Sequence, residues 1–251
     1  MILEVKMSTE LRHKQILDIL NNNGSVSVRA LTKELFVSEA TVRRDLTELE
    51  KKGALKRTFG GATPVIDTTR QVPLFIRESM DFAAKNEICR QAASLIKDGD
   101  TVFIDGSSTA QYLVKYIVHL KDIIVVTYSI KTAELMCRSH IKTYCTGGLI
   151  MENSLVCIGN DVLEFANKIN LDICFMSCKG ISLDGELTDT SEEETVIRRA
   201  FLKKSKKRVF LMTGNKFGNT YFHTLCNSRD IDHIFSDITV PRSIRTKEQV
   251  G

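Results

Sequence analysis

Three segments near the start of the chain carry apolar residues at the three- and four-residue spacing of amphipathic helices. A serine that can cap a helix precedes each segment, and glycine follows the first and the third. The pattern predicts a first helix that starts near Ser8 or Thr9, either of which could cap it, and helices that begin after Ser27 and Ser38. They end at Gly24, Leu35 and Gly53.

The sequence ALKRTFGGATP after the third helix is typical of a short β-hairpin, with Gly60-Gly61 at its tip. Phe36-Val37 form the turn between the second and third helices. Two helices joined by a tight turn and followed by a hairpin predict a winged helix-turn-helix, in which the second of the two helices enters the major groove. A three-helix bundle that contacts other proteins is the alternative.

The predicted module concentrates cations where DNA would lie. Arginine can donate two hydrogen bonds to guanine, lysine contacts phosphate, and the amino end of a helix favours anions. The residues that we expect to contact DNA are Ser27, Ser38, Glu39, Thr41, Val42, Arg43, Arg44, Lys56, Arg57, Gly60 and Gly61.

Residues 64–79 contain two of the three prolines, and the stretch between Pro64 and Pro73 has no helical or strand period. We interpret this segment as a linker. It would join a DNA-binding domain over residues 1–63 to a second domain over residues 80–251.

The rest of the chain alternates short apolar strands with helices, which predicts an α/β domain with a parallel sheet covered on both faces. The expected strands are 101–104, 123–127, 141–146, 172–177, 208–213 and 232–237. The expected helices are 83–96, 109–118, 131–137 and 192–206.

Composition agrees with a globular chain of one or two domains: 251 residues, 43% hydrophobic and 26% charged. No apolar run approaches the roughly 18 residues of a membrane span, so we expect no membrane partner. The seven cysteines are an odd number without a CxxC pair, which favours a reducing cytoplasm. The net charge of +4 divides into +3 over residues 1–63 and +1 over the remainder (4 − 3), so the surplus falls on the predicted DNA-binding module.

Small and hydroxylated residues follow most of the expected strands. In parallel α/β sheets, ligands bind beyond the carboxyl ends of the strands, and loops of this kind can hold a small anion. Each loop alone could also be an ordinary tight turn. The candidate effector-binding residues are Asp105, Gly106, Ser107, Ser108, Thr109, Thr127, Tyr128, Ser129, Gly147, Gly148, Lys179 and Lys216.

The segment VSEATVRRDLTELEKKGALKRTFGGA resembles the DNA-binding signature of the DeoR family of bacterial transcriptional regulators. The family pattern has VS, two variable residues, T, an aliphatic residue and RRDL, then LE, G, R and a wing that ends in HGGA. Phe59 stands where the family has His.

The second domain resembles the family's effector domain, which implies a fold like ribose-5-phosphate isomerase without its catalysis. The D-x-G-T-T loop falls on Asp105–Thr109, the T-N-S motif on Thr127–Ser129, and the double glycine on Gly147-Gly148. The remaining motifs, D-x-S-K-F and F-x-G-x-x-G-I, fall on residues 213–217 and 175–181. Tyr128, Ser177 and Thr213 depart from these patterns, and Gly106 and Ser107 are not in the usual order. These departures suggest an altered effector specificity or weak effector binding.

The resemblance implies a cytoplasmic transcriptional regulator, a repressor that is not an enzyme and needs no cofactor. Its partners would be operator DNA, a phosphorylated sugar or related metabolite, and further copies of itself in a dimer or tetramer. One alternative is a sugar-phosphate isomerase-like enzyme with an appended DNA-binding domain, for which Asp105, Asp184 and Glu186 are the candidate acids. Another is an architectural DNA-binding protein without a ligand.

Two further groups of residues have ordinary interpretations. The acids Glu192–Glu194 and the basic residues that follow, to Arg208, fit a largely solvated helix whose charges match its dipole. Cys174 and Cys178 have no third or fourth ligand nearby, so we interpret them as buried thiols and expect no metal.

Overall fold

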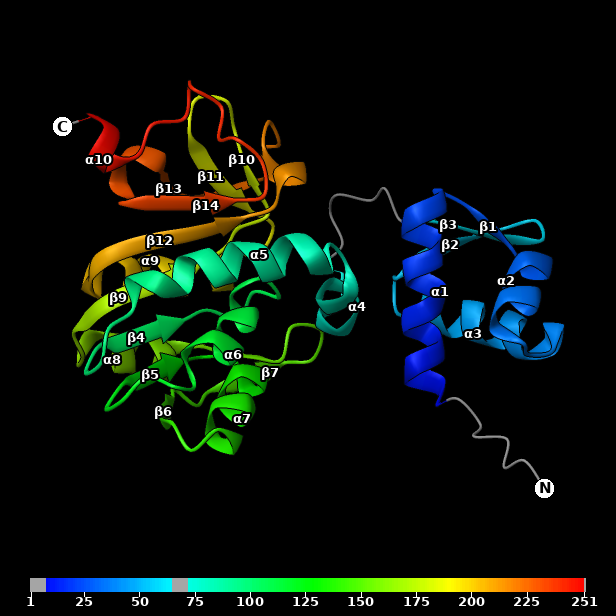
Figure 1. Cartoon of the computed structure of the whole chain (residues 1–251), viewed down its shortest axis with the longest axis horizontal. Helices are drawn as coiled ribbons and strands as arrows, with labels where there is room; N and C mark the ends of the chain where they lie inside the picture. Colours follow the sequence, from blue (N-terminus) through cyan, green and yellow to red (C-terminus); the bar gives the residue numbers. More distant parts are fainter. Residues whose placement is uncertain (1–7, 65–71, 251) are drawn as a thin grey trace. The chain divides into compact units, whose positions relative to one another are not determined.

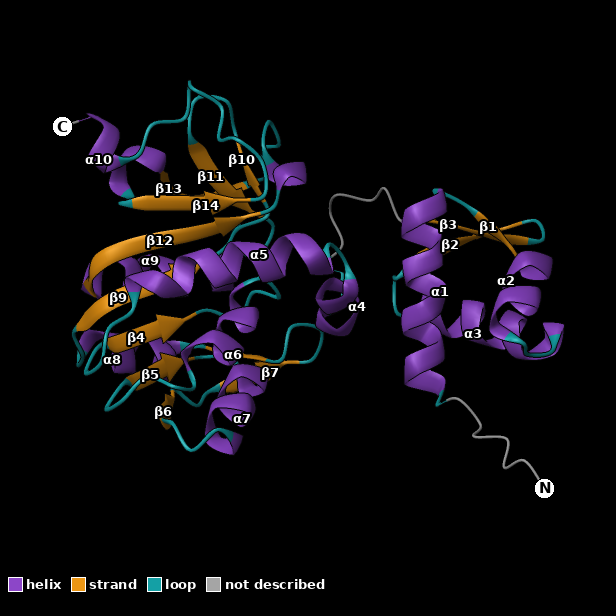
Figure 2. Ribbon diagram, in the orientation of Figure 1, coloured by secondary structure: helices purple, strands orange, loops and turns teal. Residues whose placement is uncertain are grey.

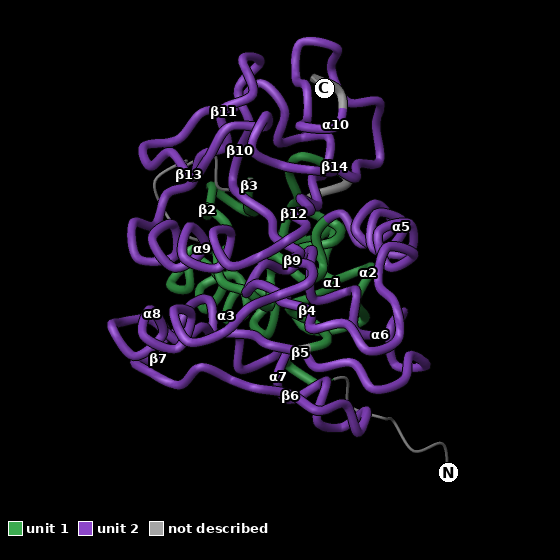
Figure 3. Tube along the Cα trace, turned by 90° about the vertical axis from the view of Figure 1, so that its left-hand side faces the viewer, with its two compact units in different colours: residues 1–80 green, residues 81–251 purple. Residues whose placement is uncertain are grey.

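The computed structural model describes residues 8–64 and 72–250 of the chain (Figure 1). The chain forms two compact units, which divide between Met80 and Asp81 (Figure 3). Each unit has a hydrophobic core of its own.

The smaller unit consists of helices packed on a short antiparallel sheet (Figure 2). Its elements are α1 (Thr9–Asn23), β1 (Val26–Ser27), α2 (Val28–Leu35), α3 (Glu39–Lys51), β2 (Leu55–Thr58), β3 (Gly61–Pro64) and α4 (Leu74–Ser79). The hydroxyls of Ser8, Ser27 and Ser38 each accept a hydrogen bond from the backbone N–H three residues later. The three predicted helices, their caps and the hairpin are therefore present.

The order of the small sheet is β1-β3-β2, and both pairs of strands are antiparallel. Gly60 turns the hairpin with φ of 88°, in the left-handed region that favours glycine. Gly61 lies directly against β1, and a Cβ atom there would overlap the carbonyl oxygen of Val26. The two tip glycines thus serve a turn and a close approach.

The predicted linker contains a helix that the sequence analysis leaves out. Residues 65–71 lie outside the described part of the chain, and α4 begins directly after Pro73. Leu74 and Ile76 of α4 are 3% and 2% exposed, and Ile76 joins the core of the smaller unit. A helix of only six residues has too few turns to show a period in the sequence.

The larger unit is built around a six-stranded sheet of order β14-β12-β9-β4-β5-β6, in which all five pairs of neighbours are parallel. The predicted parallel α/β architecture is therefore confirmed. The strands are β4 (Thr101–Ile104), β5 (Ile124–Thr127), β6 (Lys142–Cys145), β9 (Leu171–Met176), β12 (Ser205–Met212) and β14 (His233–Ser236).

Helices cover both faces of this sheet (Figure 2). One layer holds α5 (Phe82–Ala92), η1 (Ala93–Leu95), η2 (Ala110–Leu113), α6 (Val114–Ile117) and α7 (Ile130–Arg138). The other holds α8 (Asn160–Asn167) and α9 (Glu192–Lys204). Successive residues of β4 divide between them: Val102 and Ile104 pack with the first layer, and Phe103 with the second.

Several short elements complete the larger unit. The sequence analysis predicts none of them, and the three strands of two or three residues are too short to show an alternation of apolar and polar positions. They are β7 (Leu149–Met151), β8 (Val156–Ile158), β10 (Gly180–Ile181), β11 (Glu186–Asp189), η3 (Gly214–Lys216), β13 (His223–Asn227), η4 (Ser228–Asp230) and α10 (Lys247–Val250).

Within residues 8–64 and 72–250, no helix combines the length and the apolar character that crossing a bilayer requires.

Candidate functional site

The amino end of α3 is a capped and exposed helix start. The Ser38 hydroxyl accepts a hydrogen bond from the Thr41 N–H at 3.2 Å, and it lies 3.0 Å from the Thr41 hydroxyl. Arg43 and Arg44 follow on the solvent side of the helix. Arg43 forms an exposed ion pair with Glu39 at 3.1 Å. An anion that binds Arg43 can replace Glu39 at little cost in free energy.

Val42, which the sequence analysis includes among the DNA contacts, is fully buried in the core of the smaller unit. Its side chain therefore fixes α3 to the core and cannot reach a DNA base. Gly61 is also buried, against β1. Ser27 is exposed, but its hydroxyl caps α2 by accepting the Ala30 N–H.

The hairpin presents a different set of groups. Lys56 is exposed on β2, whereas Arg57 is half-buried and donates to the Thr47 hydroxyl at 2.9 Å. The backbone N–H of Arg57 also donates to Glu50 at 2.8 Å. Arg57 thus holds the wing against α3, which the sequence could not show. Phe59, beside the tip, is fully exposed.

A buried ion pair ties α1 to α3. The Arg12 guanidinium donates hydrogen bonds to both carboxylate oxygens of Asp45, and the bond from Nη2 is 2.9 Å long. Asp45 has no exposed surface. The Asp45 hydrogen bond raises the pKa of Arg12, against the opposing effect of burial. The Asp of the RRDL signature therefore positions the helix that carries the two arginines.

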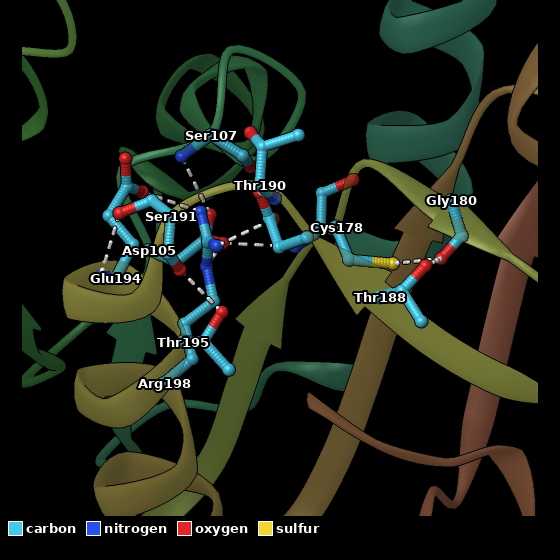
Figure 4. Close-up of polar contacts among 12 residues, drawn as sticks. Asp105, Ser107, Cys178, Gly180, Thr188, Thr190, Ser191, Glu194, Thr195 and Arg198 are labelled. Carbon is cyan, nitrogen blue, oxygen red and sulfur yellow. Dashed lines mark hydrogen bonds and ion pairs between the residues drawn. The ribbon is translucent and has the colours of Figure 1, made fainter. Parts of the chain in front are cut away.

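In the larger unit, polar groups gather at the carboxyl ends of β4, β9 and β12 (Figure 4). Asp105 follows β4 and is fully buried. Its oxygens accept the backbone N–H groups of Ser107 at 2.9 Å and Ser177 at 3.0 Å. Asp105 thereby fixes the start of the loop to the end of the neighbouring strand.

Arg198 of α9 lies beneath this loop, surrounded by three carboxylates (Figure 4). Its guanidinium contacts Asp105 at 3.2 Å, Asp189 at 2.8 Å and Glu194 at 2.7 Å. Burial alone would lower the pKa of Arg198, but Tyr128 and the three carboxylates outweigh burial and raise it.

The prediction of a largely solvated face on α9 is wrong for Glu194 and Arg198, which are 3% and 4% exposed. Within a run of charged residues, the sequence does not distinguish Glu194 and Arg198 from their exposed neighbours, because only the fold shows which positions face the sheet. The exposed acids Glu192 and Glu193 and the exposed Lys203 agree with the prediction.

Two lysines approach the same edge of the sheet. Lys216, after β12, donates to the Ser177 hydroxyl at 2.6 Å. Lys85 of α5 is 5% exposed, and its ammonium lies 3.2 Å from the Ser108 hydroxyl. The sequence analysis misses Lys85. Its position three residues before Ile88, on the apolar face of the helix, could have indicated that this lysine is buried.

The motif Thr127–Ser129 is engaged with its own backbone. The Thr127 hydroxyl accepts the Ser129 N–H at 3.0 Å, and the Ser129 hydroxyl caps α7. Tyr128 is fully buried beside the stacked pair of Phe103 and Phe201, with ring centroids 5.9 Å and 6.4 Å away. Burial raises the pKa of the Tyr128 hydroxyl well above its ordinary value.

The contacts join some of the candidate effector residues and leave others apart. Asp105, Ser107 and Lys216 belong to one network through Ser177. Gly148 packs against Ile158 of β8, and the Lys179 ammonium lies 5.9 Å from the Tyr221 ring centroid. The remaining buried members of the set, Gly106, Ser108 and Thr109, lie in the loop after β4.

The other candidate acids lie elsewhere. Asp184 and Glu186 are exposed around the turn between β10 and β11. Among the residues that the structure describes, no group of three or more His, Cys, Asp or Glu side chains could hold a metal ion.

The fold and these two sites define a class of protein: a helix-turn-helix DNA-binding unit joined to an α/β unit with polar loops at one sheet edge. A family model described as the DeoR C-terminal sensor domain matches residues 81–238, and one described as a DeoR-like helix-turn-helix domain matches residues 12–68. The chain therefore belongs to the DeoR family of transcriptional regulators.

Individual relatives agree with this assignment. The transcriptional repressor GlcR of Bacillus subtilis is 32% identical over 234 residues, which cover 92% of this chain and 89% of that protein. The glycerol-3-phosphate regulon repressor of Escherichia coli is 26% identical, with 95% and 94% covered. Among solved structures, ribose 5-phosphate isomerase A of Methanocaldococcus jannaschii is a similar chain, at 14% identity, 53% coverage of each chain and a TM-score of 0.40.

Proposed function

We propose that the chain is a repressor that binds operator DNA through α3 and the wing and that a phosphorylated sugar or related metabolite regulates it. The effector would bind at the carboxyl ends of β4, β9 and β12. The observation that carries this proposal is the pair of lysines, Lys85 and Lys216, which hold hydroxyls at this edge.

The edge suits a phosphate group for three reasons. The two ammonium groups supply positive charge, the loop after β4 supplies hydroxyls and backbone N–H groups, and Asp105 fixes the loop in place. One relative, whose name refers to repression of the glycerol-3-phosphate regulon, supports the same ligand class.

On the DNA side, we propose that Arg43 and Arg44 reach base edges from the first turns of α3. The proposal assigns Lys56 to a phosphate contact and Arg57 to the attachment of the wing. A single unit makes few contacts, so tight binding requires a symmetric dimer or tetramer on paired half-sites.

The effector acts by linkage: it must bind the state that cannot hold DNA more tightly than the state that can. A thermal-shift screen of phosphorylated sugars on the full chain tests the site. We expect at least one sugar phosphate to raise the melting temperature and the matching free sugar not to do so.

Lys216→Ala is expected to abolish that shift and to preserve DNA binding. Lys203→Ala, on the exposed side of α9, is the matched control and should leave the shift unchanged. A full shift in Lys216→Ala would show that the phosphate binds elsewhere.

We further propose that the larger unit does not turn over sugar phosphates. Both oxygens of Asp105 already accept hydrogen bonds, and Asp184 and Glu186 lie on an exposed turn. None of these three carboxylates is therefore placed to move a proton between the carbons of a bound sugar phosphate. Measurable isomerisation of pentose or hexose phosphates by the full chain would contradict this statement.

A further inference from the structure

Two cysteines that are twelve positions apart are both held at the end of the same strand. Cys145 is the last residue of β6 and pairs with Thr127 of β5. The backbone N–H of Cys157, in the middle of β8, donates to the carbonyl of Tyr128, the residue after Thr127, at 2.7 Å. Both backbones are therefore anchored to the carboxyl end of β5.

The two side chains also meet. The Cys145 side chain is near enough to the Cys157 thiol to raise its pKa, after burial, through charge and a hydrogen bond. Cys145 is exposed, whereas Cys157 is 1% exposed. Both are free thiols.

The environment separates their chemical roles. Burial, and next the neighbouring Cys145, raise the pKa of Cys157 to about 11, so Cys157 is protonated near neutral pH. The exposed Cys145 is consequently the thiol that an oxidant meets first.

We propose that Cys145 and Cys157 form a reversible disulfide, which makes this edge of the sensor unit a site of thiol oxidation. The oxidant class is a low-molecular-weight disulfide such as oxidised glutathione. The Cys145 thiolate attacks one sulfur of the oxidant and releases one molecule of small thiol. Cys157 then loses its proton and attacks the Cys145 sulfur, which breaks the mixed disulfide and releases the second thiol.

The bridge would close the segment between the two cysteines, which contains Gly147-Gly148 and β7. Leu149 of β7 already pairs with Ile158, so the bridge staples a hairpin that is formed in the reduced protein. Oxidation therefore restrains the glycine loop without a change of fold. Its influence on the effector rests on the proposed function, whereas formation of the bridge does not.

The full chain offers a direct test, because trypsin leaves both cysteines in one peptide, Thr143–Lys168, with no other cysteine. After treatment with oxidised glutathione and alkylation of free thiols, we expect this peptide to be unalkylated and about 2 Da lighter than its reduced form. Dithiothreitol should restore it. Hydrogen exchange of residues 146–155 should be slower in the oxidised protein.

Two variants make the result decisive. In Cys145→Ser, the bridge is lost and the Cys157 thiol should remain unmodified. Cys137→Ser removes an exposed thiol of α7 from another peptide and should leave the bridge intact. A stable glutathione adduct on Cys145 in the wild-type chain, or a link between two chains, would overturn the proposal.

Discussion

At the scale of single residues, the molecule places its buried charges where they hold functional segments. Arg12 and Asp45 join α1 to α3, and Arg198 holds Asp105 at the carboxyl end of β4. The helix-capping serines are readable from the sequence, because a cap needs only its local neighbours. Arg198 is not, since its burial depends on residues up to 93 positions away.

Asp45→Ala is expected to destabilise the smaller unit by about 3 kcal/mol, because it leaves the Arg12 guanidinium buried without its partner. Chemical denaturation of the full chain, monitored through the unfolding of the smaller unit, measures this loss of stability. Glu39→Ala breaks only the exposed pair with Arg43 and should cost less than about 0.5 kcal/mol. Equal losses in the two variants would refute the structural role of the buried pair.

At the scale of elements, periodic helices and the apolar strands between them are predictable from the sequence, whereas short elements without such a pattern are not. The helices α1, α2 and α3 follow from apolar spacing, and the parallel strands follow from apolar runs between helices. The elements α4, β7 and β10 have six residues or fewer, and tertiary contacts decide their conformation. The attachment of the wing by Arg57 also depends on a tertiary contact, with Thr47 of α3, so the sequence could not show it.

The wing provides an element-scale prediction. Gly61→Ala should cost about 2 kcal/mol of stability, because the new Cβ meets the backbone of β1. In Gly60→Ala the new Cβ meets open space, and only the left-handed backbone conformation is unfavourable, so we expect a loss of about 1 kcal/mol of stability. Thermal melting of the two variants ranks them, and a larger loss in Gly60→Ala would contradict the observed packing.

At the scale of the whole molecule, the surplus charge lies on the unit that meets DNA. Counterion release requires operator affinity to fall steeply with salt. Removing one phosphate contact with Lys56→Ala should make the slope of log K against log salt shallower by about 0.9. Lys203→Ala, in the basic run of α9, should leave the slope unchanged; an equal effect there would indicate a second nucleic-acid surface.

The central claim is that α3 reads DNA and that the sensor unit controls it. Its most direct test is an anisotropy titration of labelled DNA from upstream of the chain's own coding region. Wild type, Arg44→Ala and Lys216→Ala are compared, each with and without the sugar phosphate that shifts the melting temperature. We expect Arg44→Ala to weaken binding at least about tenfold. The sugar phosphate should release DNA from wild type and not from Lys216→Ala. Unchanged binding by Arg44→Ala, or equal release from Lys216→Ala, would contradict the account.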